Sequence, residues 1–291
     1  MKTIFIDGFE VPADEDWASV KERQKLQLEV LKSVIEKFES IGVEFFLAYG
    51  AVIGIARHGG HMIPWDDDVD LIMPRKDYEK AISALYEDQN FRCYEFSWDS
   101  DFRVKSAKVA IECRVQGENY EGEKSCYIDI FALDRVESFS AIRWVKLKLR
   151  ILIENVVLYR KGLLEGWRRK VCQFLSFLFP KKANRLHRMM VRMTSLPSLN
   201  FLKWRRNTLV GEMYGAYGEK CLMKWNIYHG DRERKFATLE GIRVPVPYDV
   251  HSYLANIYGE WSKAPPIEKR RPTHTLDDSW FYSELKAQKE I

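Results

Sequence analysis

The sequence lacks several features that would remove it from the ordinary globular class. No run of apolar residues approaches the roughly 18 needed for a membrane-spanning helix. The N-terminus, MKTIFIDGFEVPADED, has no basic stretch followed by an apolar one, as a secretion signal would have. The chain also has no internal repeat and no low-complexity segment. We therefore expect a protein with a sizeable core that remains in the cytoplasm.

Cysteine is scarce, and its spacing excludes two kinds of small domain. The five cysteines form no C-x-x-C pair and lie far apart, at Cys93, Cys113, Cys126, Cys172 and Cys221. An odd, scattered set argues against both a disulfide framework and a zinc knuckle. We expect buried free thiols.

Charge is abundant but unevenly placed. The whole chain has a formal net charge of +4, with 46% hydrophobic and 30% charged residues. Residues 141–210 contain 17 Lys and Arg against 2 Asp and Glu, a net charge of +15, so the remainder carries −11. Such an uneven charge distribution is informative about the binding partners of the protein and not about its fold.

The order of patterns predicts an α/β (α+β) fold with a mixed-sheet core. Apolar residues at mostly three- and four-residue spacing predict a helix over 16–41. Short apolar runs predict strands, and helical segments alternate with them. The expected strands are 43–49, 68–73, 91–98, 104–115 and 125–131, the expected helices 50–56, 74–85 and 249–258, and KFATLEGIRVPVP predicts a strand pair or one bent strand.

This order suggests three parts of the chain. We expect a catalytic core at 1–138 and a mostly helical, basic region at 139–230 that docks on an acceptor or a membrane. A C-terminal block at 231–291 would complete the active site. The alternative for the middle region is a plain solvated helical face.

The most informative segment is IPWDDDVDLIM, residues 63–73. Asp68 and Asp70 are two residues apart on a predicted strand, so both carboxylates should lie on one face of the sheet. Like charges so close repel, and a divalent cation such as Mg²⁺ or Mn²⁺ would offset that repulsion. The alternative is a solvated turn that caps the next helix, but the interleaved apolar residues argue against it.

A second acidic candidate is Asp129, which Ile128 and Ile130 flank in YIDIFALD. A carboxylate in a buried strand needs a partner. If this strand neighbours 68–73, Asp129 would complete a three-carboxylate metal site. The alternative is a structural Asp bonded to backbone amides. Asp134 is interpreted as a turn residue.

Two further segments carry candidate phosphate-binding residues. In YGAVIGIARHGG, Gly50 precedes a short helix whose free N–H groups suit a phosphate, and Arg57 and His58 follow. In PPIEKRRPTH, the arginines offer bidentate forks. These candidates are Arg270, Arg271 and His274, and the alternative is a solvated basic tail.

These motifs resemble the LicD family of bacterial phosphorylcholine transferases, which has fukutin-like enzymes as distant relatives. FLAYGAVIGIARHGGHMIPWDDDVDLIMPRKDYEK resembles its opening motif, YIDIFALD its second, and the stretch from LEGIRVPVP to KRRPTH its C-terminal block. The resemblance spans residues from about 20 to 275, although Ala132 stands where proline is common and Ile55–Ala56 replaces another small apolar pair.

The resemblance implies a nucleotidyltransferase-type core with a metal pair that matches Asp68 and Asp70. It also implies an activated donor such as CDP-choline and a glycan or lipid-linked glycan acceptor. On this interpretation the Gly50 turn, Arg57, His58 and Asp66 lie on the donor side. Asp129 would then bind a second metal ion or accept the proton of the acceptor hydroxyl.

Two other functions are compatible with the same fold. One is nucleotidyl transfer to a nucleic acid or another small acceptor, and the other is a non-catalytic binding module. The sequence shows no RNA-binding motif, so we expect no nucleic-acid partner. An anionic membrane surface is the expected partner of the basic region, which makes a peripheral position on the inner face of the membrane an option.

Overall fold

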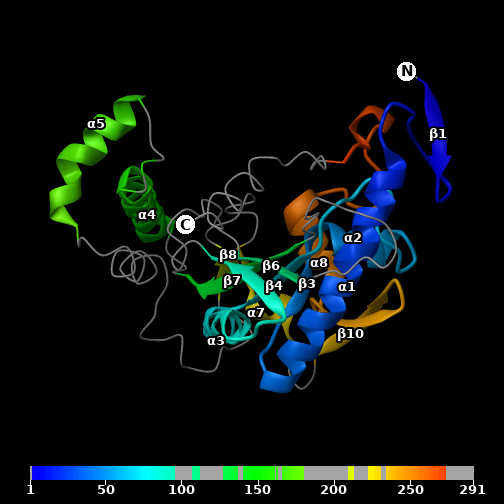
Figure 1. Ribbon diagram of the computed structural model, residues 1–291, viewed down its shortest axis with the longest axis horizontal. Coiled ribbons are helices and arrows are strands. Elements are labelled where there is room, and N and C mark those ends of the chain that lie inside the picture. Colours follow the sequence, from blue (N-terminus) through cyan, green and yellow to red (C-terminus); the bar gives the residue numbers. More distant parts are fainter. Residues whose placement is uncertain are drawn as a thin grey trace.

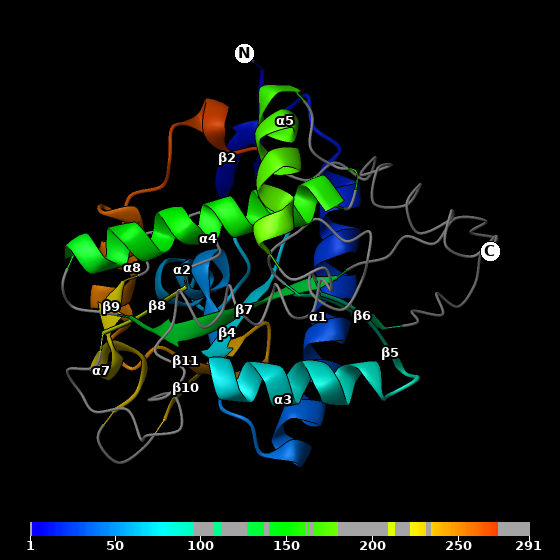
Figure 2. The same ribbon diagram turned by 90° about the vertical axis from the view of Figure 1, so that its left-hand side faces the viewer.

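The computed structural model describes residues 2–95, 107–111, 127–136, 140–160, 162, 166–179, 209–212, 222–230 and 234–272. Figure 1 shows a central sheet with helices around it, and Figure 2 shows the same arrangement turned by 90°. The predicted class, a mixed sheet combined with helices, is confirmed.

The chain begins with a hairpin that the patterns did not predict. Strands β1 (Thr3–Ile6) and β2 (Phe9–Pro12) pair antiparallel across a two-residue turn. Asp7 and Gly8 form this turn with φ of 48° and 81°. Positive φ at both positions matches the right-handed twist of a tight hairpin, and Asp-Gly is a preferred sequence for it.

Helix α1 (Trp17–Ile41) follows, close to its predicted bounds. Asp16 caps its first turn by accepting from the Ser19 N–H at 3.1 Å, and Gly42 ends it with a left-handed φ of 63°. Its apolar face is buried in the main core. Two polar residues of the same helix, Gln24 and Gln27, are buried as well.

The main sheet contains seven strands in the part of the chain described here, with the path β3-β4-β7-β6-β5 and β8 and β9 joined through β7. Its strands are β3 (Phe46–Ala48), β4 (Asp70–Pro74), β5 (Phe91–Tyr94), β6 (Ala107–Ile111), β7 (Ile128–Arg135), β8 (Leu209–Glu212) and β9 (Met223–Lys224). β4 and β7 are parallel, and the other neighbours are antiparallel.

Short helices connect and cover this sheet. α2 (Tyr49–Arg57) follows β3 directly, and α3 (Arg75–Tyr86) connects β4 to β5 and packs on β4, β5 and β7. The short α7 (Trp225–Tyr228) follows β9. Strands β8 and β9 lie within 139–230, which was predicted to be mostly helical. They form because β8 pairs with β7 and β9 with β8, contacts that a local pattern does not encode.

The C-terminal elements pack against the β3 edge of the sheet. Strands β10 (Lys235–Leu239) and β11 (Ile242–Val246) form a hairpin, the first of the two predicted alternatives, and α8 (Val250–Tyr258) and the 3₁₀ turn η4 (Ile267–Lys269) follow. β11 contacts β3, while β10 and α8 contact α2. Leu239, Val244 and Tyr253 belong to the same core as the sheet.

Helices α4 (Ser140–Arg160) and α5 (Gly166–Leu175), with the 3₁₀ turn η1 (Ser176–Leu178), have a small core of their own. That core consists of Ile153, Val156, Val157 and Cys172. Cys93 and Cys172 are buried free thiols, whereas Cys113, Cys126 and Cys221 lie outside the described residues. The three-part division of the chain stays a prediction.

Candidate functional site: an acidic cluster at the start of β4

Two buried glutamines of α1 hold the backbone of the acidic segment. The Gln24 side-chain amide donates to the carbonyls of Ile63 at 2.9 Å and Asp66 at 2.6 Å. The Gln27 amide donates to the carbonyls of Asp67 at 2.8 Å and Tyr127 at 3.3 Å. Because these carbonyls are buried, they need such donors, and the loop before β4 is therefore fixed to α1.

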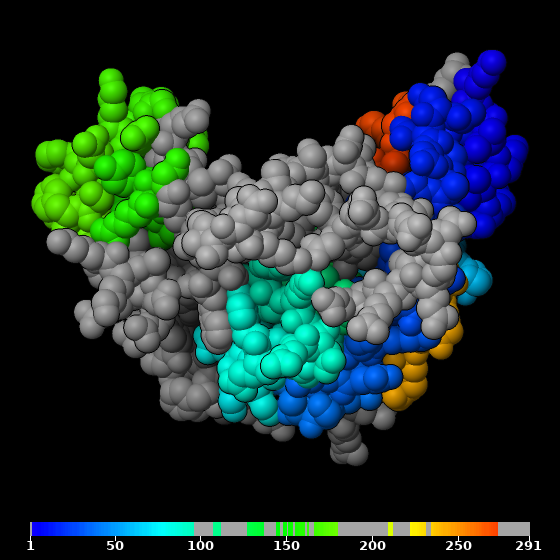
Figure 3. Space-filling model, in the orientation of Figure 1, coloured from blue at the N-terminus to red at the C-terminus, as the bar shows by residue number. Residues whose placement is uncertain are grey.

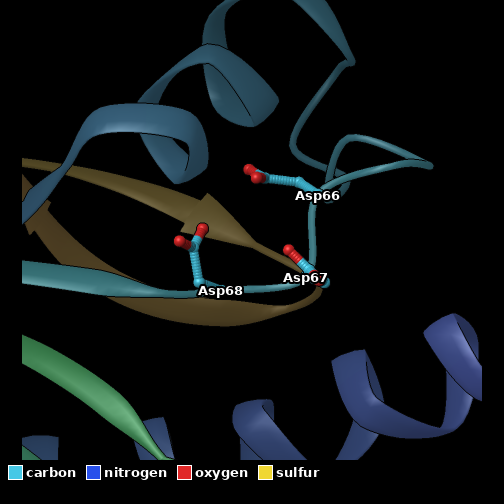
Figure 4. A group of neighbouring side chains, drawn as sticks. All are labelled: Asp66, Asp67 and Asp68. Carbon is cyan, nitrogen blue, oxygen red and sulfur yellow. The ribbon is translucent and has the colours of Figure 1, made fainter. Parts of the chain in front are cut away.

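Three consecutive carboxylates lie together on that loop. One oxygen from each of Asp66, Asp67 and Asp68 lies within 4.8 Å of the others. In Figure 4 the carboxylates of Asp66 and Asp68 point into a common space below α2. Oδ2 of Asp66 is buried and has no hydrogen-bond partner within the described residues. A buried carboxylate oxygen in this position calls for a cation.

Asp70 and Asp129 continue this acidic surface across the sheet. They are register partners on the parallel strands β4 and β7, and both are buried. The Asp129 N–H also donates to the Val69 carbonyl at 3.1 Å. The condition set out above for Asp129, that its strand neighbours the acidic strand, is met.

The charges of this group act strongly on each other. Burial, followed by the carboxylates of Asp68 and Asp129, raises the pKa of Asp70 well above its usual range. Burial, followed by Asp68 and Asp67, does the same to the pKa of Asp66. In the protein alone the cluster therefore favours proton uptake, and a bound cation would remove that preference.

Lys108 on β6 is a site residue that the motifs did not reveal. It is buried and is the register partner of Asp129, to whose Oδ2 its ammonium donates at 2.8 Å. Its Nζ also lies 3.6 Å from the centre of the Tyr127 ring. Although burial opposes the charge, the Asp129 carboxylate prevails and raises the pKa of Lys108. A lone Lys in the apolar run AKVAI was the available signal, since a buried charge needs a partner.

Gly50 lies in the first turn of α2, where Asp66 reaches it. A methyl group at Gly50 would stand 2.1 Å from Oδ2 of Asp66. The preceding residue, Tyr49, has a left-handed φ of 48° and donates its N–H to the Tyr253 hydroxyl at 3.1 Å. Gly50 thus permits the close approach of a carboxylate in the structure. A phosphate in this helix turn stays a prediction.

Arg57 connects the site to the C-terminal segment. Its Nη1 donates to the carbonyls of Trp261 and Lys263, both at 2.9 Å, and its Nε donates to Nε2 of His58 at 3.0 Å. Burial and the positive charge of Arg270 lower the pKa of Arg57, while Asp66 opposes this effect. The structure therefore brings both Arg270 and Asp66 within electrostatic reach of Arg57.

His58 is placed among aromatic rings. Its ring centre lies 4.4 Å from that of Phe9 and 5.9 Å from that of Trp65. Burial and the Arg57 charge lower the pKa of His58 to about 4. The ring is neutral at pH 7, so it cannot contribute a positive charge to phosphate binding and instead accepts from Arg57.

The two C-terminal arginines point to different partners. Arg270 donates to the carbonyls of Pro265 at 2.9 Å and Glu10 at 2.8 Å, and its guanidinium lies 5.3 Å from the Trp65 ring centre. Arg271 forms ion pairs with Asp14, at 3.0 Å, and Glu15. In this structure Arg271 is committed to the N-terminal segment, whereas Arg270 lies beside Arg57. The candidate His274 lies outside the described residues.

The interpretation of Asp134 as a turn residue was wrong. It lies within β7, is fully buried, and accepts two hydrogen bonds from Arg75, at 3.0 and 2.7 Å. Strand β7 continues beyond the apolar run because β8 pairs with its second half. A bidentate arginine satisfies the buried carboxylate there.

Taken together, these residues suit a hard divalent cation. Oxygen-only carboxylate ligands are those that Mg²⁺ and Mn²⁺ prefer. The best-assembled set is Asp66, Asp67 and Asp68, with Asp70 and Asp129 behind it, rather than Asp68, Asp70 and Asp129 alone. Two arginines close to an acidic cluster are also suited to bind a phosphate whose charge a cation shares.

Comparison with known proteins agrees with this geometry. Residues 42–150 match the family described as LicD/FKTN/FKRP, nucleotidyltransferase domain. That segment includes β3, α2, β4 and β7, and thus every acidic residue of the site. The chain is also 25% identical over 270 residues to the lipopolysaccharide cholinephosphotransferase LicD of Haemophilus influenzae, covering 88% of this chain and 96% of that protein. The family resemblance is confirmed.

Proposed function

Starting from the LicD/FKTN/FKRP nucleotidyltransferase domain at residues 42–150, we propose that the protein is a phosphotransferase. It would move a phosphate-linked group from a nucleotide-activated donor to a sugar hydroxyl. The first donor to test is CDP-choline, and the first acceptor is a cell-surface glycan or glycolipid such as lipopolysaccharide. The similarity to a lipopolysaccharide cholinephosphotransferase supports this choice.

The observation that supports the proposal most is the crowding of carboxylates around an unpartnered oxygen. Oδ2 of Asp66 has no hydrogen-bond partner within the described residues, and one carboxylate oxygen from each of Asp66, Asp67 and Asp68 lies within 4.8 Å of the others. We propose that Asp66, Asp67 and Asp68 hold Mg²⁺ or Mn²⁺, with Asp70 beside them. The bound cation would neutralise the donor diphosphate and stabilise the leaving nucleotide oxygen.

The protein's own groups would bind and orient the donor. Arg57 acts electrostatically on Asp66 of the acidic cluster, and Arg270 lies within electrostatic reach of Arg57. Hydrogen bonds from Arg57 to the Trp261 and Lys263 carbonyls would keep the C-terminal segment against the donor side. A segment held there would exclude water from part of the site and strengthen its electrostatic interactions.

Asp129 would act on the acceptor. It lies beside Asp70 in register, and Lys108 donates to its Oδ2. A carboxylate held by a lysine keeps a fixed orientation, which suits a residue that receives the acceptor hydroxyl proton. The same carboxylate could instead bind a second metal ion. Counting the metal ions bound by Asp129→Asn distinguishes the two roles, because only a metal ligand would lower that number when it is replaced.

The experiment that tests this function measures CMP release from CDP-choline. Purified protein is assayed with lipopolysaccharide, in the presence of Mg²⁺ and after EDTA. Asp68→Asn should lower turnover at least about 100-fold, because metal stabilisation is worth several kcal/mol and each 1.36 kcal/mol is tenfold. Glu36→Gln, an exposed carboxylate on α1, serves as the control and should keep full activity.

Two results would contradict the proposal. One is a folded Asp68→Asn protein with unchanged CMP release. The other is incorporation of whole nucleotides into RNA without any transfer to a glycan, which would favour nucleotidyl transfer instead. A thermal-shift panel of nucleotide-diphosphate donors with Mg²⁺ identifies the donor, because specific binding raises the melting temperature by mass action.

A further inference from the structure

The α4–α5 unit, defined as residues 140–160 and 166–179, is the most unusual surface of the molecule. In Figure 1 both helices lie to one side of the sheet, and Figure 3 shows their side chains as a lobe at the edge of the molecule. The unit has its own small core around Val156 and Cys172, separate from the main one. No helix of the described residues is long and apolar enough to cross a bilayer.

Large apolar side chains cover the outer side of α5 and η1. The exposed fractions are 71% for Trp167, 71% for Phe174 and 70% for Phe177. Trp167, Val171, Phe174 and Leu178 recur at spacings of four, three and four residues, so they form one exposed stripe. Cys172 faces the other way and is buried against α4. Several such side chains in neighbouring turns, left in water, mark an interaction site.

Helix α4 also exposes large apolar side chains. Trp144 is 58% exposed, and Val145, Leu149 and Ile151 are exposed as well. The buried residues Ile153 and Val157 occupy the side that faces α5. The exposed apolar residues of α4 therefore do not take part in the packing between the two helices, and neither do those of α5.

Positive charge surrounds both apolar surfaces. Lys148 lies with Nζ 5.4 Å from the Trp144 ring centre, and the Arg168 guanidinium lies 5.8 Å from that of Trp167. Arg169 and Lys170 are exposed in the same turn. Residues 140–179 contain nine Lys and Arg against two Glu. Arg160 is an exception, because it donates to the carbonyls of Ser176 and Phe179 and fixes η1.

We propose that the α4–α5 unit docks on the surface of an anionic lipid bilayer. Trp167, Phe174, Phe177 and Leu178 would enter the boundary between headgroups and acyl chains, and the flanking Lys and Arg would contact lipid phosphates. Tryptophan beside basic residues suits this boundary, because the ring has an apolar body and a polar N–H. The proposal holds for any donor or acceptor and does not depend on the reaction at the acidic cluster.

Two other occupants fit the same surface less well. A second copy of the chain would bring two strongly positive surfaces together, which repel each other. A nucleic acid would gain from the aromatic rings and the charge, but not from aliphatic side chains such as Val171, Leu178 and Ile151. Only a bilayer has a use for the aliphatic, aromatic and basic residues together.

The test is co-sedimentation of the full chain with vesicles. One set contains phosphatidylglycerol and phosphatidylcholine at 3:7 (about 30% anionic lipid), and the other contains phosphatidylcholine alone. We expect binding to the anionic vesicles and at least tenfold weaker binding to the neutral ones. Trp167→Ser/Phe174→Ser should lower the partition coefficient at least tenfold at low salt. Tyr248→Ser removes an aromatic side chain that is 47% exposed elsewhere and should bind as the wild type does.

A charge variant separates the two contributions. Arg168→Gln/Arg169→Gln/Lys170→Gln should lose most anionic selectivity, whereas Lys25→Gln/Lys32→Gln, which changes exposed lysines of α1, should keep it. Circular dichroism and the main melting transition verify that each variant is folded. Equal binding of wild type and the aromatic variant would overturn the proposal. So would RNA binding or dimer formation that depends on Trp167 and Phe174 in a protein that leaves the vesicles unbound.

The proposed reaction and this docking are tested independently. Asp68→Asn should bind vesicles as the wild type does while it loses turnover. The aromatic variant should release CMP normally with a water-soluble acceptor and fail only with an acceptor embedded in vesicles.

Discussion

Gly50 has no side chain, and this absence leaves space for the Asp66 carboxylate of the acidic cluster. The Asp66 carboxylate occupies the space that a side chain at position 50 would need, with Oδ2 at 2.1 Å. Gly50→Ala should therefore displace Asp66 and cost about 1–3 kcal/mol, as overpacking does. Urea unfolding of the single variant and of Gly50→Ala/Asp66→Ala measures this, because the alanine should cost little once Asp66 is shortened. Strict additivity of the two changes would contradict the explanation.

His58 makes the stability of the protein depend on pH. Its pKa is about 4 in the fold, because burial and Arg57 disfavour the charged ring, against 6.5 in the unfolded chain. The unfolded state therefore binds a proton first as the pH falls. The contribution of the neutral His58 ring to the free energy of unfolding is fully present above pH 6.5. It is lost progressively as the pH falls toward 4, and the total loss is at most about 3 kcal/mol.

The measurement compares the wild type with His58→Gln, which has no titrating ring. The melting temperature of the wild type should fall more between pH 7.5 and pH 5 than that of the variant. A parallel fall in both proteins would assign the pH dependence to other groups.

At the scale of strands, three side chains form one row across the sheet. Asp70 on β4, Asp129 on β7 and Lys108 on β6 are successive register partners. Partners in register share one face of the sheet. The row places a negative, a negative and a positive group side by side in the core, and the lysine offsets part of the repulsion.

A double-mutant cycle tests the Lys108–Asp129 pair. Lys108→Met alone leaves Asp129 buried without its ammonium partner and should cost about 3–5 kcal/mol, the usual result for one half of a buried pair. Asp129→Asn in addition should recover much of that loss in urea unfolding. A coupling energy below about 0.5 kcal/mol would mean that the pair does not act as a unit.

The patterns predicted the helices well because their information is local. Trp17–Ile41 shows helical spacing with a cap at each end, and α3 begins at Arg75, one residue after the predicted start at Pro74. The acidic strand and its neighbour could be identified, but their adjacency could only be stated as a condition. Pairing of β4 with β7 joins residues about 60 positions apart, which no local pattern encodes.

What the patterns missed has the same cause. The partner of Lys108 lies 21 residues away, and Arg75 and Asp134 are 59 residues apart. The ion pairs of Arg271 with Asp14 and Glu15, more than 250 residues away, were likewise invisible to local patterns, while its role as a phosphate ligand stays a prediction. The hairpin of β1 and β2 is the exception, because its Asp7–Gly8 turn was a local signal.

At the scale of the whole molecule, two separate cores predict two levels of stability. The main core holds the acidic cluster, whereas within the described residues the small core of α4 and α5 contains four buried apolar residues. Regions with few buried contacts open at lower free energy than the core strands. The α4–α5 unit should thus open locally while β4 and β7 stay closed.

Hydrogen exchange followed by mass spectrometry measures this difference. Val156→Ala removes two methyl groups from the small core and should cost about 1–3 kcal/mol there. Amides of α4 and α5 should exchange faster, and those of β4 and β7 should be unchanged. Val34→Ala in α1 is the matched control, and it should speed exchange in the main core instead. Faster exchange everywhere in Val156→Ala would show one cooperative unit.

The hydrogen bonds of the two arginines span most of the polypeptide. Arg57 reaches carbonyls 204 and 206 residues later, and Arg270 reaches one 260 residues earlier. During translation the acidic loop leaves the ribosome long before the segment that carries Trp261 and Arg270. A nascent chain that stops before residue 261 would therefore expose an acidic loop without this support, and the site can mature only after residues 261–270 have been made.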